Sequence, residues 1–311
     1  MKNRKRGLHH ISIISGDGQR NAEFYVYTLG LKMVLKTVDQ DDPSSYHLFY
    51  ANGSGQPGSS ITFFPWPMAS QGEPGTGEAV AISFAVPSGS IDYWAERLNK
   101  EGVDFKGPFT RFGHQVMSLR DSDGLQLELV FDQNANDLHA WTERKVPAEY
   151  GIRGFWSTTL RLVDGSTTAE ILENVLGFEL KKHTDNMTLY QTGSGIGHSV
   201  IIEEAEQPAY GKNGRGIIHH VAFRAEDELE QLAMKKELER RGLYPTEVID
   251  RHVFKAVYCR LPDGVLFEIS TDGPGYTAAQ KEEELGHKLF LPYWLEPNRE
   301  EIERNLPEIN V

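Results

Sequence analysis

A weak fourfold repeat constrains the fold of this chain more than any other feature of its sequence. Four stretches with helical patterning each close on a glycine, at Gly30, Gly102, Gly177 and Gly242. A glycine just past a helix adopts the left-handed backbone conformation at little steric cost, so each of them indicates a helix C-terminus. Their spacing of roughly 70 residues predicts four structural units of similar size.

Each unit combines one helix with several strands. A strand-like run precedes each helix, namely HHISII from His9, VAISFAV from Val80, WSTTLRL from Trp156 and HHVAFRA from His219. Further strand-like runs follow each helix, and they end in SSITFFPW, LQLELVF, HSVIIEE and VLFEIST. Since one such unit cannot bury its sheet alone, we expect an α+β fold of four βαβββ modules, paired into two cup-like sheets with the helices outside.

The modules are expected to form two domains. A length of 311 residues suffices for two domains of ordinary size. We place an N-terminal domain of two modules at residues 7–131, a linker at 132–150, a C-terminal domain of two modules at 151–272 and a tail at 273–311. The linker lacks clear periodicity, and the tail is acidic and interrupted by prolines, so we expect the tail to wrap around the surface.

Composition narrows the class of protein. With 39% hydrophobic and 25% charged residues the chain is typical of a soluble globular protein, and no stretch approaches the roughly 20 apolar residues of a membrane helix. The basic start runs into a strand pattern instead of a signal sequence, so a cytoplasmic protein is expected. A net charge of -13 argues against a nucleic-acid partner. The single cysteine, Cys259, excludes internal disulfides and thiolate metal clusters.

Histidine pairs and strand glutamates are the candidate chemical groups. Modules one and four open on His9-His10 and His219-His220. Because neighbouring side chains on a strand point to opposite faces, one histidine of each pair is expected to enter its cup. Modules two and four end on apolar strands that contain a glutamate, Glu128 and Glu268, and such a carboxylate costs free energy unless it is paired, protonated or bound to a metal.

The pairing of modules decides whether these groups form a metal site. Modules two and three carry Ala81 and Ser157 near the histidine positions, so that pair lacks a full ligand set. Pairing module one with four provides two histidines and Glu268, the set associated with non-haem Fe(II) oxygen chemistry. Sequential pairing would leave one histidine and one glutamate in each cup, which is a weaker site. Glu128 is then interpreted as a structural carboxylate.

Other histidines have no support from the repeat and are interpreted as ordinary packed or surface residues: His47, His114, His139, His183, His198, His252 and His287.

The sequence resembles the vicinal oxygen chelate (glyoxalase/bleomycin resistance/extradiol dioxygenase) superfamily, and within it the hydroquinone-type ring-cleaving dioxygenases. The segments that carry the resemblance are LHHISI, TVDQDDPSSYHLFYANGSGQPGSSITFFPWP, GIIHHVAF, DRHVFKAVYCRLPDGVLFEISTDGPGY and LGHKLFLPYWLEPNREEIE. The resemblance implies that module one pairs with four and module two with three. It also implies an Fe(II) site with His10, His220 and Glu268 as ligands, with Mn(II), Zn(II) or Ni(II) as alternative metals, that cleaves hydroquinone- or catechol-type rings with O2.

The same resemblance implies roles beside the metal for Arg251, Tyr258, His9, His219 and Ser12. Arg251 would hold negative charge of the substrate, and Tyr258 would hydrogen-bond a bound oxygen or take part in proton transfer. His9 and His219 would orient the ligand strands or accept protons, and direct contact with the substrate is not expected of them because they face away. Ser12 stands where a threonine is commoner and keeps the hydroxyl.

Two other functions stay open at this stage. A glyoxalase-like isomerase or lyase would use Ni(II) or Zn(II) as a Lewis acid and usually draws on a further carboxylate, where this sequence offers Thr62 or Phe63. A quinone- or antibiotic-binding resistance protein would bind without turnover and has no need of the intact triad.

The pocket and the oligomeric state are less constrained by the sequence. Phe64, Trp66 and Phe254 are candidates to line a pocket, although core packing is the commoner role of such residues. A homo-oligomer is common for enzymes of this size.

Overall fold

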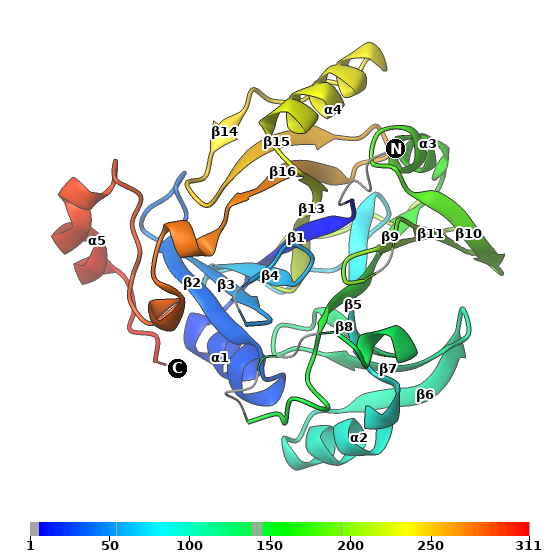
Figure 1. The fold of residues 1–311 in the computed structure, drawn as a ribbon, viewed down its shortest axis with the longest axis horizontal. Helices are drawn as coiled ribbons and strands as arrows, with labels where there is room; N and C mark the ends of the chain where they lie inside the picture. The colour runs from blue at the N-terminus through cyan, green and yellow to red at the C-terminus, as the bar shows by residue number, and fades with distance from the viewer. Residues whose placement is uncertain (1–5, 54, 139–140, 142–144, 194, 311) are drawn as a thin grey trace.

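The computed structural model describes residues 6–53, 55–138, 141, 145–193 and 195–310. Four modules follow one another along the chain, and each contains a strand, a helix and further strands (Figure 1). Module 1 consists of β1 (Leu8–Ser15), α1 (Gly18–Glu23), a π-helical turn (Phe24–Thr28), β2 (Lys32–Val38), β3 (Tyr46–Ala51) and β4 (Ser60–Pro65). Module 2 consists of β5 (Glu78–Pro87), α2 (Ile91–Lys100), β6 (Phe105–Arg111), β7 (His114–Arg120) and β8 (Gln126–Asp132).

The second half of the chain repeats this order. Module 3 consists of β9 (Gly154–Leu162), α3 (Ser166–Asn174), β10 (Glu179–Thr184), β11 (Met187–Gln191) and β12 (Ser199–Glu204). Module 4 consists of β13 (Ile217–Ala225), α4 (Glu228–Arg240), β14 (Ile249–Asp250), β15 (Phe254–Arg260) and β16 (Leu266–Pro274), and the tail carries α5 (Arg299–Asn305). Short 3-10 turns lie at Ser88–Ser90, Gln133–Ala135, Tyr276–Ala278, Glu282–Glu284 and Glu296–Asn298.

The four repeat glycines end their helices as predicted. Their φ angles are 73° at Gly30, 69° at Gly102, 74° at Gly177 and 75° at Gly242, all in the left-handed region. A side chain at any of these positions would strain the backbone, so the glycine repeat reflects a real geometric requirement of the module.

The modules form two eight-stranded sheets. The first sheet has the order β14-β15-β16-β13-β1-β4-β3-β2, and the second has the order β10-β11-β12-β9-β5-β8-β7-β6. Antiparallel pairs, β1 with β13 and β5 with β9, join the two modules of each sheet. The predicted pairing of module 1 with 4 and of module 2 with 3 is therefore confirmed, and we call the sheets the first cup and the second cup.

Helices cover the sheets on the side away from the concave faces. Helix α4 packs on β13, β15 and β16 and buries Met234 and Leu238, while α2 buries Trp94 and Leu98. None of the helices in the described part of the chain is long and apolar enough to cross a lipid bilayer.

The C-terminal tail runs along the edge strand β2 of the first cup (Figure 1). Phe290 N donates to Lys36 O over 2.8 Å, and Leu291 and Ile302 are buried against Val38. An uncovered edge strand exposes unpaired backbone groups, and the tail satisfies part of this edge. The division into domains at 7–131 and 151–272 stays a prediction; each cup takes one module from each half, and β16 continues to Pro274.

We predict that Ile11→Ala lowers the free energy of unfolding by about 2–5 kcal/mol, because Ile11 is fully buried on the central strand β1. Urea denaturation followed by circular dichroism measures the effect. The control is Leu229→Ala, at a position of α4 that is 79% exposed, where a change within about 0.5 kcal/mol is expected. Equal losses in the two variants would contradict the central place of β1 in the core.

Candidate metal centre

The three predicted metal ligands lie together on the concave face of the first cup. His10 stands on β1, His220 on β13 and Glu268 on β16, which are consecutive strands of the sheet. The distance to Glu268 Oε2 is 2.9 Å from His220 Nε2 and 3.4 Å from His10 Nε2, and the two Nε2 atoms are 3.4 Å apart. All three residues are buried. Nowhere else in the described chain do three His, Cys, Asp or Glu side chains converge in this way.

Strand register explains why the carboxylate comes from module 4 alone. Glu268 lies beside Ala222 of β13, and Thr62 lies beside Ser12 of β1 in the equivalent parallel pair of module 1. Thr62 therefore occupies the position in module 1 that Glu268 occupies in module 4. The sequence left Thr62 and Phe63 as alternatives for a fourth ligand position, and the register selects Thr62, which has a hydroxyl and no carboxylate.

The equivalent positions of the second cup hold a different arrangement. Ser83 pairs with Ser157 across β5 and β9 and with Glu128 across β5 and β8. Glu128 Oε2 accepts hydrogen bonds from Ser83 Oγ and from Arg111 Nη1, both over 2.7 Å. Arg111 thus supplies the positive charge beside this carboxylate, which supports the interpretation of Glu128 as a structural residue.

His9 and His219 lie directly behind the two ligand histidines. His9 Nδ1 is 2.9 Å from His10 Nδ1, and His219 Nδ1 is 2.8 Å from His220 Nδ1. Only one nitrogen of each pair can carry the proton. If His10 and His220 carry it and their neighbours accept, the Nε2 lone pairs of His10 and His220 are free to bind a cation, which is the tautomer that a metal ligand needs.

Burial and charge set the protonation of these groups. Burial lowers the pKa of His9 well below its ordinary value, and the neighbouring His10 lowers it further. Burial also lowers the pKa of His220, and Glu268 offsets this only in part. Burial raises the pKa of Glu268, but His10 and His220 together outweigh burial and hold that pKa well below its usual range. The result is an ionised carboxylate that faces two imidazole nitrogens.

The side chains fit a divalent cation. Glu268 Oε1 accepts from Ser270 Oγ over 2.5 Å, whereas Oε2 is buried and forms no hydrogen bond within the described part of the chain. A buried carboxylate oxygen without a donor is costly, and a metal ion would remove that cost. Two imidazoles and one carboxylate suit Fe(II), Mn(II), Zn(II) or Ni(II) and leave coordination positions open.

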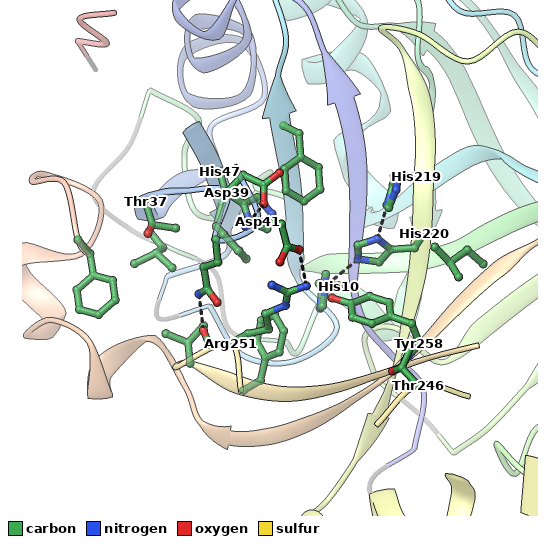
Figure 2. A pocket seen from close by; sticks show the side chains of 18 of the residues that line it. His10, Thr37, Asp39, Asp41, His47, His219, His220, Thr246, Arg251 and Tyr258 are labelled. Atoms are coloured by element: carbon green, nitrogen blue, oxygen red, sulfur yellow. Dashed lines mark hydrogen bonds and ion pairs between the residues drawn. The ribbon is translucent and has the colours of Figure 1, made fainter. Parts of the chain in front are cut away.

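A cavity of about 320 Å³ opens from these ligands. Figure 2 shows His10 and His220 at one side of it, with Arg251 and Tyr258 reaching toward them. The aromatic residues named from the sequence line it, and the full lining is His10, Leu35, Thr37, Asp39, Gln40, Asp41, His47, Phe49, Phe64, Trp66, His219, His220, Thr246, Arg251, Val253, Phe254, Tyr258, Leu266 and Phe290. His219 belongs to this lining although the sequence indicated that it would face away. His9 and Ser12 do not belong to it.

Arg251 and Tyr258 stand together at the cavity. Arg251 Nη2 is 3.0 Å from Asp41 Oδ2, and the Arg251 guanidinium carbon is 5.7 Å from the centroid of the Tyr258 ring. Tyr258 lies opposite Glu268 across β15 and β16, and its ring meets the His220 ring edge-on at 5.5 Å. Burial raises the pKa of Tyr258 and Glu268 raises it further, so its hydroxyl keeps the proton and can donate it to a ligand.

The sequence alone does not indicate several of the cavity residues. It favours an ordinary packed or surface role for His47, although the alternation of His47 and Phe49 along β3 indicates that both face the same side. Asp39 and Asp41 come from the loop after β2, and Phe290 comes from the tail. No local pattern points from such segments to a site, because their position depends on tertiary packing.

Comparisons with known proteins match the whole length of the chain. The family model described as Glyoxalase/Bleomycin resistance protein/Dioxygenase superfamily matches residues 7–129 and 154–269. "Putative ring-cleaving dioxygenase MhqO" of Bacillus subtilis (strain 168) is 38% identical over 314 residues, which cover 100% of this chain and 99% of that protein. "Chlorohydroquinone/hydroquinone 1,2-dioxygenase" of Sphingobium indicum is 32% identical, with 97% and 96% covered. A crystal structure titled as a putative dioxygenase from Bacillus subtilis has a TM-score of 0.94 and 37% identity, with 99% of both chains covered.

We predict that Glu268→Gln, His10→Ala and His220→Ala each abolish stoichiometric iron binding while the protein stays folded, because each removes one of the three candidate ligand groups. Iron is measured by elemental analysis after anaerobic loading and desalting, and folding by circular dichroism. The matched control is Glu128→Gln, which changes the glutamate of the second cup and should leave the iron content at the wild-type level. Full occupancy in any of the three triad variants would remove that residue from the ligand set.

Proposed function

Because the chain belongs to the glyoxalase/bleomycin resistance protein/dioxygenase superfamily, we propose that it is a ring-cleaving dioxygenase that holds Fe(II) between His10, His220 and Glu268. Its substrate is a hydroquinone- or catechol-type ring, and its co-substrate is O2. The single observation that carries the proposal is the convergence of the three ligand atoms, two of which belong to histidines, His10 and His220, that line a cavity with aromatic walls. The names of the full-length relatives agree with this activity.

The ligand residues and their supports provide a preorganised seat for the metal. Bound Fe(II) supplies a Lewis acid that lowers the pKa of a phenolic hydroxyl and a redox-active centre for O2. His9 and His219 contact the rings of His10 and His220 through their Nδ1 atoms, and Ser270 donates a hydrogen bond to the second oxygen of Glu268. Positioning of this kind reduces the reorganisation that the reaction requires.

Apolar walls hold the ring of the substrate. Phe49, Phe64 and Phe254 face the cavity from β3, β4 and β15, and Phe290 adds a wall from the tail. These side chains exclude water and offer flat surfaces to an aromatic ring. A planar phenol is thereby placed with its hydroxyl toward the ligand histidines.

Arg251 and Tyr258 act on the polar side of the substrate. The guanidinium stays positive and presents several donors, so it stabilises negative charge that develops on the oxygens of the substrate. Tyr258, whose pKa is raised, donates a hydrogen bond from a protonated hydroxyl. Asp41 holds Arg251 in place through their ion pair.

The alternative of a glyoxalase-like isomerase is disfavoured by one position. Thr62 occupies the place equivalent to Glu268 in module 1, and its hydroxyl is engaged with Ser12 Oγ over 2.7 Å. The further carboxylate that such isomerases draw on is therefore replaced by a hydroxyl there.

We predict that the anaerobically iron-loaded protein consumes one O2 per substrate when it is mixed with a panel of hydroquinones and catechols, and that it forms a ring-opened chromophore. An oxygen electrode measures the consumption of O2, and absorbance spectroscopy measures the ring-opened chromophore. The Glu268→Gln variant serves as the inactive control. If no compound of the panel causes O2 uptake, and a hemithioacetal is consumed without O2, the isomerase hypothesis would replace the dioxygenase hypothesis.

We predict that Arg251→Ala retains iron but lowers turnover about 100-fold, which is the scale of losing one charge-stabilising donor. Steady-state O2 uptake and elemental analysis measure the two quantities. Arg120→Ala is the control, because Arg120 is an exposed arginine of the second cup that binds Gly124 O over 2.6 Å. Unchanged kinetics in Arg251→Ala would show that Arg251 has no role in turnover.

A further inference from the structure

A second group of polar side chains faces the cavity on strands that supply no metal ligand. Thr37 of β2 and His47 of β3 are cross-strand partners in the first cup, and both line the cavity (Figure 2). Neither has a role in holding the triad. Cross-strand partners lie close enough to act on one ligand group.

Only one of the two ring nitrogens of His47 has a hydrogen-bond partner in the described structure. Its Nε2 is 2.9 Å from Thr62 Oγ1, and Thr62 Oγ1 is 2.7 Å from Ser12 Oγ. The ring packs between Phe49 and Phe64, with centroid distances of 4.1 Å and 4.0 Å. Nδ1 of His47 has no hydrogen-bond partner among the residues that the structure describes. The ring therefore presents one unused nitrogen in a defined orientation.

Thr37, the cross-strand partner of His47, carries an unused hydroxyl. The residue is only 4% exposed, and its Oγ1 is buried without a hydrogen-bond partner in the described structure. A buried hydroxyl without a hydrogen-bond partner costs free energy, because it has lost its contacts with water. In a strand of the cavity wall, such a cost indicates a group that a ligand satisfies.

We propose that Thr37 and His47 form a specificity subsite that binds a neutral, hydrogen-bonding substituent of the aromatic substrate, above all a hydroxyl group remote from the metal. This inference rests on the proposed function, since it concerns a second substituent on the ring whose first hydroxyl faces His10 and His220. His47 Nδ1 and Thr37 Oγ1 provide its hydrogen bonds. The stacked ring of Phe64 and the tilted ring of Phe49 hold the His47 ring in its orientation.

The hydrogen bonds behind His47 allow it to accept or to donate. If Thr62 donates to Ser12, it accepts from His47 Nε2, and Nδ1 is then an acceptor. If Ser12 donates to Thr62, the Thr62 hydroxyl donates to Nε2, and Nδ1 then carries the proton. A hydroxyl substituent, which both donates and accepts, is served by either arrangement.

Charge around the subsite favours a neutral group over an anion. Asp39 and Asp41 line the same cavity, and Arg251 is already paired with Asp41. Two acidic side chains would repel a carboxylate substituent, and Arg251 is already neutralised by its ion pair with Asp41. Burial also lowers the pKa of His47 well below its ordinary value, so its ring carries no compensating charge at neutral pH.

Binding of phenol and of the three dihydroxybenzene isomers tests the subsite. Isothermal titration under anaerobic conditions, with the Fe(II)-loaded protein, gives a dissociation constant for each ligand without turnover. We expect at least one dihydroxybenzene to bind about 5- to 10-fold tighter than phenol, the value of one neutral hydrogen bond. His47→Phe and Thr37→Val should each reduce this ratio toward one and leave phenol affinity and iron content close to wild type.

Module 3 offers a matched pair of control residues. His183 Nδ1 is 2.8 Å from Thr188 Oγ1 on neighbouring strands of the second cup, outside the cavity. His183→Phe and Thr188→Val make the same chemical changes and should keep the wild-type ratio. Circular dichroism and iron content show whether each variant is folded.

The outcomes separate the subsite from the proposed function. If His47→Phe and Thr37→Val keep the full ratio, or weaken phenol and dihydroxybenzenes equally, the subsite is wrong and the residues only form the wall. If wild-type protein binds phenol with no preference for a second hydroxyl, the subsite again fails while the dioxygenase proposal stands. If the loaded protein binds no phenol of any kind, the proposed function fails and the subsite fails with it.

Discussion

The antiparallel pairing of β1 with β13 is the contact on which the site depends. It joins two modules that are separated by about two thirds of the chain and places Ser12 opposite His220 and His10 opposite Ala222. Because side chains alternate along a strand, a shift of this register by one residue would turn one ligand histidine into the core and bring its neighbour into the cup. Apolar residues such as Ile11 and Val221, buried on the opposite face, hold the register. Core packing and the relative position of the two candidate ligand histidines are therefore set by the same strand pair.

The two cups show how one framework supports different chemistry. Both use the same order of strands, and both carry a buried glutamate on the last strand of one module, Glu268 and Glu128. In the second cup Arg111 matches the charge of Glu128 directly, so the carboxylate is satisfied within the protein. In the first cup Glu268 faces two imidazoles, and its Oε2 has no hydrogen bond in the described structure. The difference lies in the side chains beside the carboxylate, and among the described residues only the first cup gathers three side chains that could together bind a metal ion.

Much of the framework could be predicted from the sequence because it rests on local signals. Gly30 and the three equivalent glycines report helix ends, and the alternating strands report the faces of the sheets. The histidine pairs and Glu268 identify the module pairing, since only one pairing collects a full ligand set. The direction of His219 was harder to predict: alternation along β13 places it away from the cup, yet its ring reaches the cavity and meets the ring of His220 at Nδ1. The contributions of Asp41 and Phe290 had no local signal, because a loop and the tail reach the cavity only through tertiary packing.

The cavity draws its parts from different regions of the first cup. The ligands come from the central strands β1, β13 and β16, which are fixed by hydrogen bonds on both sides. The walls come from the flanking strands β2, β3, β4 and β15, the loop that carries Asp41, and the tail residue Phe290. The Arg251–Asp41 ion pair connects module 4 with module 1 at this outer region. Under the proposed function, substitutions at Thr37, His47 or Phe290 are therefore expected to change which ring is accepted without moving His10, His220 or Glu268, because these wall residues lie outside the central strands.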